Sequence, residues 1–274
     1  MKPLPFFKMS GSGNDFIIID NRHNIIDETV LADLITGACR RKLSVGADGL
    51  ILVENSETVD FKWRFFNSDG SVAEMCGNGA RCAARYAFLN QIAGSELAFE
   101  TQAGIVQALV GEERVKIKMT DPFDLKIDLT LNLEQGALQV SSVNTGVPHV
   151  VVSVDDIDLA PVDSMGREIR YHAQFAPAGT NVNFTCPQAD GIIAIRTYER
   201  GVEGETLACG TGSVAAAIVG ARTSDLDSPV NLLTRSGERL TIYFEEKAGN
   251  YVNVHLEGDA RVIYQGELWE EAWK

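Results

Sequence analysis

The stretch "MCGNGARCAARYAFL", Met75 to Leu89, sets a cysteine directly before a Gly-x-Gly turn that leads into a helical run. A second stretch, "ACGTGSVAAAIVGAR", Ala208 to Arg222, repeats the pattern. The second run is apolar on every side, which indicates a helix that is buried all round. The sequence therefore predicts two buried helices, one beginning after Cys76 and the other after Cys209.

The two cysteine loops belong to an internal duplication. Cys209 lies 133 residues after Cys76, and the same offset relates further motifs. They are "TQAG" from Thr101 and "TRSG" from Thr234, "GADG" from Gly46 and "GTNV" from Gly179, and Gly13 of "GSGNDF" and Gly146 of "NTGVPH". Matches in one register over most of each half indicate two copies of one domain.

Each copy is predicted to be a curved, mostly antiparallel sheet wrapped around its central helix, which makes the fold α+β with two pseudo-symmetric domains. Strand-like runs such as "DFIIID" and "VNFTC" come before each cysteine loop, and hairpin-like runs follow each helix. The tail "GDARVIYQGELWEEAWK" lies beyond the repeat and is predicted to return as a strand to the first domain. The predicted domains are residues 1–120 with 260–274, and residues 121–259.

Composition narrows the classes of partner. The net charge of −14 over 274 residues argues against nucleic acid and anionic membrane surfaces. The chain has neither an apolar run of the roughly 20 residues that span a membrane nor a signal-peptide pattern. Its five cysteines form no CxxC pair, which favours reduced thiols in the cytoplasm and argues against a zinc site. No nucleotide-binding glycine motif is present.

The repeated cysteine loops predict a proton-transfer site. The first-turn N–H groups of a helix lack intrahelical partners and carry the positive end of the helix dipole. Each loop is therefore predicted to bind an anion, with a thiol beside the bound anion. Such a position is expected to lower a thiol's pKa from about 8.5. Two thiols on opposite faces of one α-carbon would supply the base and the acid that invert a stereocentre, without a cofactor or a metal.

The alternative for a single cysteine at a helix start is that it is merely a small, tolerated residue. The occurrence of the same loop in both halves argues against that interpretation. A redox pair is disfavoured because the two cysteines lie in separate domains. Cys82, inside the first helix, is predicted to pack in the core.

The same segments resemble the diaminopimelate epimerase family of cofactor-independent amino-acid racemases. The resemblance covers nearly the whole chain and is carried by "KMSGSGNDF", "NSDGSVAEMCGNGARC", "NTGVPH", "GTNVNF" and "RTYERGVEGETLACGTG". It implies epimerisation of LL-diaminopimelate to meso-diaminopimelate, in lysine and peptidoglycan synthesis, by a thiolate/thiol pair. It also implies a cytoplasmic homodimer that needs neither pyridoxal phosphate nor another cofactor.

The resemblance also implies roles for individual residues. Cys76 and Cys209 correspond to the acid/base pair, and Glu199 and His149 to residues that assist near the reacting centre. The backbone of Gly77, Asn78, Gly210 and Thr211 would hold the carboxylate at that centre. The distal amino and carboxylate groups would be bound by Asn14, Asn67, Asn181 and Arg200. Tyr264 is expected at the dimer interface.

Two positions depart from the family pattern. Many relatives have Asn where this chain has Val147, and some have Gln where it has Gly49. The distal pocket is therefore expected to make one or two fewer polar contacts, which affects the strictness of substrate choice and leaves the proton transfer unchanged.

Three other functions remain open from the sequence. A racemase of the same fold could act on another amino acid such as histidine, but it would have no use for Arg200 and the asparagines. A non-catalytic relative could bind carboxylates, although both cysteines are retained. A thiol–disulfide oxidoreductase would be recognised by reduction of insulin.

Overall fold

The computed structural model describes residues 3–274, apart from the side chain of residue 189, and the chain divides into two compact units. Unit 1 is the chain up to Ile117 together with Gly258–Lys274, and unit 2 is Lys118–Glu257. The domain limits expected from the sequence stay a prediction.

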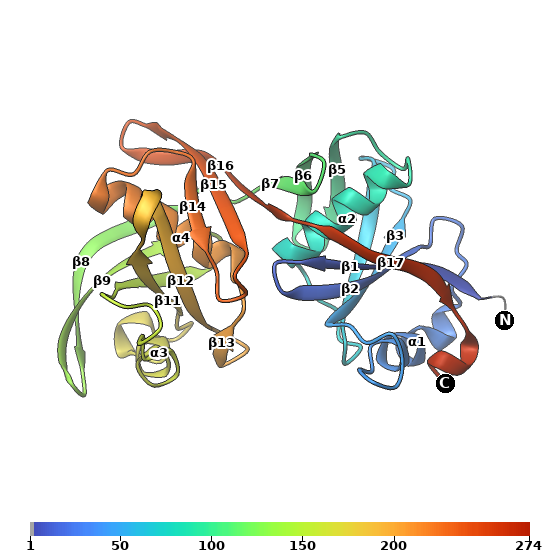
Figure 1. Ribbon diagram of the computed structural model, residues 1–274, viewed down its shortest axis with the longest axis horizontal. Coiled ribbons are helices and arrows are strands. Elements are labelled where there is room, and N and C mark those ends of the chain that lie inside the picture. Colours follow the sequence, from blue (N-terminus) through green and yellow to red (C-terminus); the bar gives the residue numbers. More distant parts are fainter. Residues whose placement is uncertain (1–2) are drawn as a thin grey trace. The chain divides into compact units, whose positions relative to one another are not determined.

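Unit 1 is one sheet with a helix on each face (Figure 1). Its strands are β1 (Leu4–Gly11), β2 (Asn14–Asp20), β3 (Gly49–Glu54), β4 (Phe61–Asn67), β5 (Glu96–Thr101), β6 (Gly104–Val110), β7 (Arg114–Lys118) and β17 (Arg261–Leu268). Its helical segments are η1 (Glu28–Val30), α1 (Leu31–Ala38), α2 (Gly77–Leu89) and η4 (Glu270–Ala272). The strands pair in the order β17-β1-β2-β3-β4-β5-β6-β7, with β2–β3 and β4–β5 parallel and the other pairs antiparallel.

Unit 2 repeats this architecture. Its strands are β8 (Phe123–Leu133), β9 (Gly136–Asn144), β10 (Pro148–Ser153), β11 (Asn181–Pro187), β12 (Ile192–Glu199), β13 (Gly204–Thr206), β14 (Val230–Leu233), β15 (Arg239–Lys247) and β16 (Asn250–Asp259). Its helical segments are α3 (Val162–Arg170), η2 (Ala173–Phe175), η3 (Ala189–Gly191) and α4 (Gly210–Ser224). The order β8-β9-β10-β11-β12-β14-β15-β16 has its parallel pairs at β10–β11 and β12–β14, as the duplication requires.

Each sheet curves around its second long helix. Helix α2 packs against β1, β2, β3 and β6, and α4 packs against β8 to β12, β14 and β15. On the other face of unit 1, Ile17 and Ile19 of β2 pack in a core with Leu34 of α1. Strands covered on both faces read as continuous apolar runs, which explains "DFIIID". The predicted α+β fold of sheets wrapped around central helices is confirmed.

Two smaller expectations are also confirmed. The C-terminal tail returns to unit 1 as β17, which pairs antiparallel with β1 from Leu4↔Leu268 to Ser10↔Arg261. Cys82 is fully buried in α2.

The last residues of the chain dock on α1 through a glycine. A Cβ placed on Gly37 would lie 2.1 Å from the carbonyl oxygen of Trp273 and 2.6 Å from its Cα. Both atoms belong to the backbone, so no side-chain rotation can relieve the clash. The close approach of η4 to α1 therefore requires a residue without a Cβ.

We predict that Gly37→Ala destabilises the protein by about 1–3 kcal/mol, because the overpacking outweighs the roughly 1 kcal/mol that alanine gains in a helix. Urea unfolding followed by tryptophan fluorescence measures the change. Gly94→Ala is the matched control, since its new Cβ would meet nothing closer than the Glu96 carbonyl oxygen at 3.7 Å. A Gly37→Ala protein as stable as the wild type would contradict this account of the docking.

Candidate active site

In unit 1 the candidate functional residues include the N-terminus of α2. Cys76 is its N-cap, with an extended backbone (φ −146°, ψ 116°), and its Sγ accepts a hydrogen bond from the Gly79 N–H at 3.5 Å. A Cβ on Gly79 would lie 3.4 Å from atoms of both Phe16 and Ile51, so the first turn sits close against the sheet. The thiol is thus held beside the backbone N–H groups of a buried helix, as the sequence predicts.

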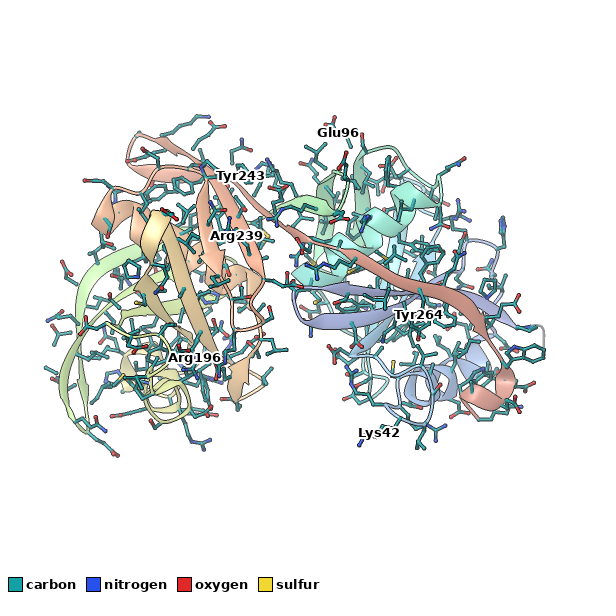
Figure 2. The ribbon with its side chains drawn as sticks, viewed as in Figure 1. Lys42, Glu96, Arg196, Arg239, Tyr243 and Tyr264 are labelled. Carbon is teal, nitrogen blue, oxygen red and sulfur yellow. The ribbon has the colours of Figure 1, made fainter. Side chains whose placement is uncertain are left out.

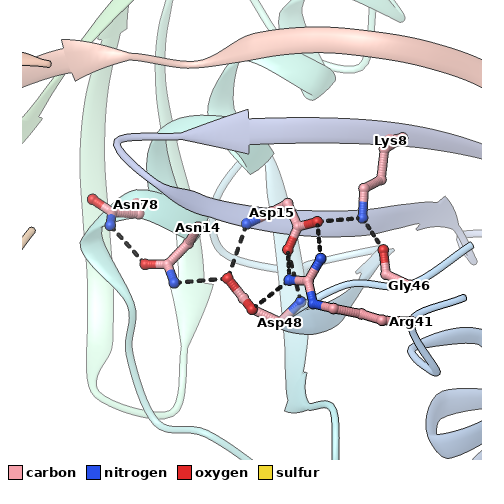
Figure 3. Close-up of polar contacts among 7 residues, drawn as sticks. All are labelled: Lys8, Asn14, Asp15, Arg41, Gly46, Asp48 and Asn78. Carbon is pink, nitrogen blue, oxygen red and sulfur yellow. Dashed lines mark hydrogen bonds and ion pairs between the residues drawn. The ribbon is translucent and has the colours of Figure 1, made fainter. Parts of the chain in front are cut away.

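A chain of polar contacts runs from this turn to β2 (Figure 3). Asn78 Nδ2 donates to Asn14 Oδ1 at 2.8 Å, and Asn14 Nδ2 donates to Asp48 Oδ2 at 2.9 Å. At the other end, the fully buried Arg81 donates to Asn78 Oδ1 at 2.8 Å. A guanidinium only donates and a carboxylate only accepts, so both amide orientations are determined. Asn14 therefore presents a defined donor and acceptor.

Ion pairs hold the carboxylate at the end of this chain. Arg41 Nη2 contacts Asp48 Oδ1 at 2.7 Å and Asp15 Oδ1 at 2.6 Å, and Lys8 Nζ lies 2.8 Å from Asp15 Oδ2. Burial acts to raise the pKa of Asp15, but the hydrogen bonds from Arg41 and Lys8 outweigh burial and lower that pKa. Sequence reasoning missed Asp15, Arg41 and Asp48. The only signal was that Asp15 and Asp48 lie inside the two glycine motifs "GSGNDF" and "GADG".

Asn67 and Gly49 belong to neighbouring strands of the same unit. Asn67 is exposed at the end of β4, where its Nδ2 donates to Ser71 Oγ at 2.9 Å, so it also stabilises a turn. A Cβ on Gly49 would lie 2.5 Å from both the Phe65 ring and the Phe66 carbonyl oxygen. Position 49 therefore has no room for a side chain.

In unit 2 the candidate functional residues include the N-terminus of α4. Cys209 is its N-cap, is 8% exposed, and has its Sγ 3.5 Å from Thr211 Oγ1. Burial raises the pKa of the Cys209 thiol to about 12, and the charge of Glu199 adds to the shift. The expectation of a lowered pKa was therefore wrong for this thiol. The Thr211 hydroxyl and the nearby backbone N–H groups of Gly212 and Thr211 act to lower its pKa, but desolvation is the larger effect.

Glu199 ends β12 and is half-buried. Burial raises its pKa, while a hydrogen bond from Thr206 Oγ1 to Glu199 Oε2 at 2.9 Å acts in the opposite direction. Because its charge acts on Cys209, a cation near Glu199 would favour the Cys209 thiolate.

Asn181 and Arg200 form a polar neighbourhood at the same end of β12, since Arg200 directly follows Glu199. Asn181 Oδ1 accepts from the Arg200 N–H at 2.9 Å, and its Nδ2 donates to the Pro148 carbonyl oxygen at 3.1 Å. Arg200 Nη1 donates to the Ala178 carbonyl oxygen at 3.2 Å. Within residues 3–274, no carboxylate forms an ion pair with Arg200. The guanidinium therefore keeps donors for a carboxylate from outside the chain.

His149 lies in β10 and is 1% exposed. Its Nδ1 lies 3.1 Å from Asn183 Nδ2, and its Nε2 is buried with no hydrogen-bond partner among the described residues. Burial, aided by the charge of Arg200, lowers the pKa of His149 to about 3. A buried polar group without a hydrogen bond lowers the stability of the fold by about 1–3 kcal/mol. Nε2 is therefore a candidate for a hydrogen bond to a ligand. Asn183 was missed, although it lies two residues from Asn181 and so on the same strand face.

The buried neutral His149 predicts a specific loss of stability in acid. A depressed pKa contributes stability that is present above the unfolded-state pKa of about 6.5 and is lost as the pH falls towards 3. Between pH 7 and pH 5 this group should lower the free energy of unfolding by about 2 kcal/mol. His149→Gln should lose correspondingly less over that range, as measured by urea unfolding at both pH values. Thr185→Val provides the control, since it changes a buried residue that does not ionise and should keep the wild-type pH dependence; equal pH dependence in all three proteins would exclude a buried neutral His149.

Sequence comparisons relate the chain to known proteins. Residues 6–124 and 141–263 match the family model of diaminopimelate epimerase. The diaminopimelate epimerase of Aquifex aeolicus is 46% identical, with 98% of this chain and 99% of that protein covered. That of Archaeoglobus fulgidus is 43% identical, with coverages of 97% and 96%.

Solved structures of more distant proteins share the fold. A phenazine biosynthesis protein of the PhzF family from Bacillus anthracis has a TM-score of 0.76 at 18% identity and covers 98% of this chain and 100% of its own. A probable proline racemase from Agrobacterium radiobacter has a TM-score of 0.67 at 17% identity, with coverages of 97% and 93%. With a family model that matches most of its length and relatives above 40% identity, the chain belongs to the diaminopimelate epimerase family.

Proposed function

We propose that this chain interconverts LL- and meso-diaminopimelate by moving the α-proton, with Cys76 and Cys209 as base and acid on opposite faces of the α-carbon. The observation that carries the proposal is the repeated device: a cysteine N-cap at the start of a buried helix in each unit. The product would serve lysine and peptidoglycan synthesis in the cytoplasm. The names of the full-length relatives support this choice of substrate.

The helix termini supply the electrostatic part of the reaction. The N–H groups of Gly77, Asn78, Gly210 and Thr211 would bind the carboxylate next to the reacting carbon. Proton removal spreads negative charge into that carboxylate, and prearranged N–H donors stabilise the charge as it develops. The chemistry then consists of two proton transfers between sulfur and carbon, with no group transferred to the protein.

The substrate itself would adjust the acidity of Cys209. Burial and the charge of Glu199 hold the pKa of Cys209 high. The ammonium group on the reacting carbon is a cation, and binding it to Glu199 would remove the negative potential that opposes thiolate formation. His149 would donate a hydrogen bond near the same centre.

Arg200, Asn181, Asn14 and Asn67 would bind the distal ammonium and carboxylate. Arg200 suits the carboxylate because its planar fork makes two parallel hydrogen bonds. Asn14 and Asn181 have amides oriented by neighbouring groups, so each offers a defined donor or acceptor. These polar groups distinguish the proposed function from that of a racemase whose substrate, such as histidine, has no distal ammonium and carboxylate.

Turnover of LL-diaminopimelate in deuterated water tests the proposal. Early meso product should carry deuterium at the inverted α-carbon, while recovered LL substrate stays unlabelled, because each face has its own acid/base group. Cys76→Ser and Cys209→Ser should each lower turnover by about 10²–10⁴-fold. Cys82→Ala, which removes a buried thiol from the same helix, should keep near-wild-type turnover. Deuterium in recovered substrate as early as in product would contradict a two-base mechanism.

Arg200→Gln tests the distal carboxylate. Loss of one partner of a buried charge pair is worth about 2–5 kcal/mol, so kcat/KM for diaminopimelate should fall by at least about 30-fold, mainly through KM. The matched control is Arg196→Gln in β12, the strand that ends just before Arg200, and it removes the ion pair to Glu205 at 2.6 Å. That variant should lose stability but keep its KM. Unchanged kinetics in Arg200→Gln would favour a substrate without a distal carboxylate.

The homodimer expected from the resemblance is also a proposal, with Tyr264 at the interface. Tyr264 lies on β17 (Figure 2), is 44% exposed, and packs edge-on against Phe6. Its neighbour Ile263 is 54% exposed, so β17 shows apolar side chains on both faces.

Tyr264→Glu should shift the protein from a dimer towards the 29.8 kDa monomer in sedimentation velocity experiments, because a charge is costly to bury at an interface. Leu159→Glu is the control, since Leu159 is an exposed apolar residue of the other unit. Its sedimentation should match that of the wild type. A wild-type protein that sediments as a monomer would refute the dimer.

A further inference from the structure

A hydrogen-bond chain crosses three neighbouring strands of unit 2 and ends at His149. Asn183 of β11 lies beside Val151 of β10 and Thr197 of β12. Thr197 Oγ1 donates to Asn183 Oδ1 at 3.0 Å, and Asn183 Nδ2 donates to the Val150 carbonyl oxygen at 2.9 Å. The same Nδ2 lies 3.1 Å from His149 Nδ1. Asn183 is fully buried, so protein groups alone determine its orientation.

The orientation of the Asn183 amide follows from its partners. A backbone carbonyl oxygen can only accept, so the amide atom facing Val150 must be the nitrogen. The amide oxygen then faces the Thr197 hydroxyl, which can donate to it. One hydrogen of Nδ2 goes to Val150, and the other points at His149 Nδ1.

The tautomer of His149 follows in turn. A ring nitrogen that accepts a hydrogen bond carries no proton, and a neutral imidazole has one N–H. The proton of His149 is therefore on Nε2, the nitrogen that is buried without a partner. Burial also keeps the ring neutral, since the pKa of His149 is lowered to about 3.

Asn183 also packs tightly against α4. A Cβ on Gly212, in the first turn of α4, would lie 2.2 Å from Asn183 Oδ1. The amide oxygen thus occupies the space that a side chain would take, three residues after Cys209. Thr197 on one side and α4 on the other leave the amide little room to rotate.

We propose that Asn183, oriented by Thr197, is a positioning residue that holds His149 as the Nε2–H tautomer, so that His149 serves the reaction as a hydrogen-bond donor and not as a base. The proposal deepens the proposed function, and it rests on that function for the use of His149 in turnover. The tautomer itself is a property of the substrate-free protein and can be measured without any activity.

The test is nitrogen-15 NMR of protein labelled in its four histidines, with the His149 signals assigned by their loss in His149→Gln. At neutral pH the wild type should show His149 with a protonated Nε2 and an unprotonated Nδ1. In Asn183→Asp an oxygen faces Nδ1, so the proton should move to Nδ1. Turnover of LL-diaminopimelate should then fall by about 10²–10³-fold, the usual effect of losing one preorganised donor, with a smaller change in KM.

Two further variants keep the test decisive. Asn183→Leu is close in size and carries no charge, so if the aspartate variant fails to fold it should still show a mixture of both tautomers and a lower kcat. Thr185→Val is the control: Thr185 lies two residues further along the same strand face, is also buried, and donates to the Val152 carbonyl oxygen instead of to the chain. It should keep the wild-type tautomer and kcat.

Each remaining outcome has one meaning. A wild-type His149 protonated on Nδ1, or an unchanged tautomer in both Asn183 variants, overturns the proposal. A switched tautomer with unchanged turnover overturns the role of His149 as a donor. If the wild type has the Nε2–H tautomer but does not epimerise diaminopimelate, the proposed function fails and the assignment of the tautomer stands.

Discussion

The first turn of a buried helix is the constraint on which this molecule depends. The sheet of unit 1 curves around α2, and the sheet of unit 2 curves around α4. The surrounding strands keep water from part of each helix, so the N–H groups of its first turn cannot all be hydrogen-bonded to water. At α2 the thiol of Cys76 accepts one of them, from Gly79. At α4 the side chain of Cys209 makes no capping hydrogen bond. The positive end of each helix therefore remains available for an anion, and a sulfur atom stands beside it.

Duplication of this scaffold does not duplicate its electrostatics. Cys209 is nearly fully buried and feels the charge of Glu199. Cys76 is half-buried, and its helix carries the buried Arg81 where the corresponding position of α4 is Val214. Each unit thus places a cysteine at the N-terminus of a helix, but the two thiols differ in burial and in the charges near them. In the proposed mechanism, the substrate's own ammonium group compensates for part of that difference.

The fold could be predicted from the sequence because its features are local or repeated. The Cys-Gly-x-Gly turns, the apolar helices and the 133-residue offset need no knowledge of tertiary contacts. The acidity of Cys209 could not be predicted, since it depends on desolvation by residues distant in sequence. The contact of Asn183 with His149 joins residues 34 positions apart, and it depends on the parallel pairing of β10 with β11. Side-chain partners of this kind follow from strand register, which the sequence pattern does not determine.

The two departures from the family pattern bear on how the distal groups would be recognised. At Gly49 the Phe65 ring and the Phe66 backbone exclude any side chain, and at Val147 no amide is present. Recognition would then rest on fewer groups, chiefly Asn14 and Arg200. Asn14 is linked through Asp48 to the ion pairs of Arg41. A polar group held in place before binding loses less entropy on binding than a mobile one. Rigid support of the remaining contacts can therefore offset the missing amides, and selectivity would depend on Asp48 and Arg41, which touch no substrate in the proposed mechanism.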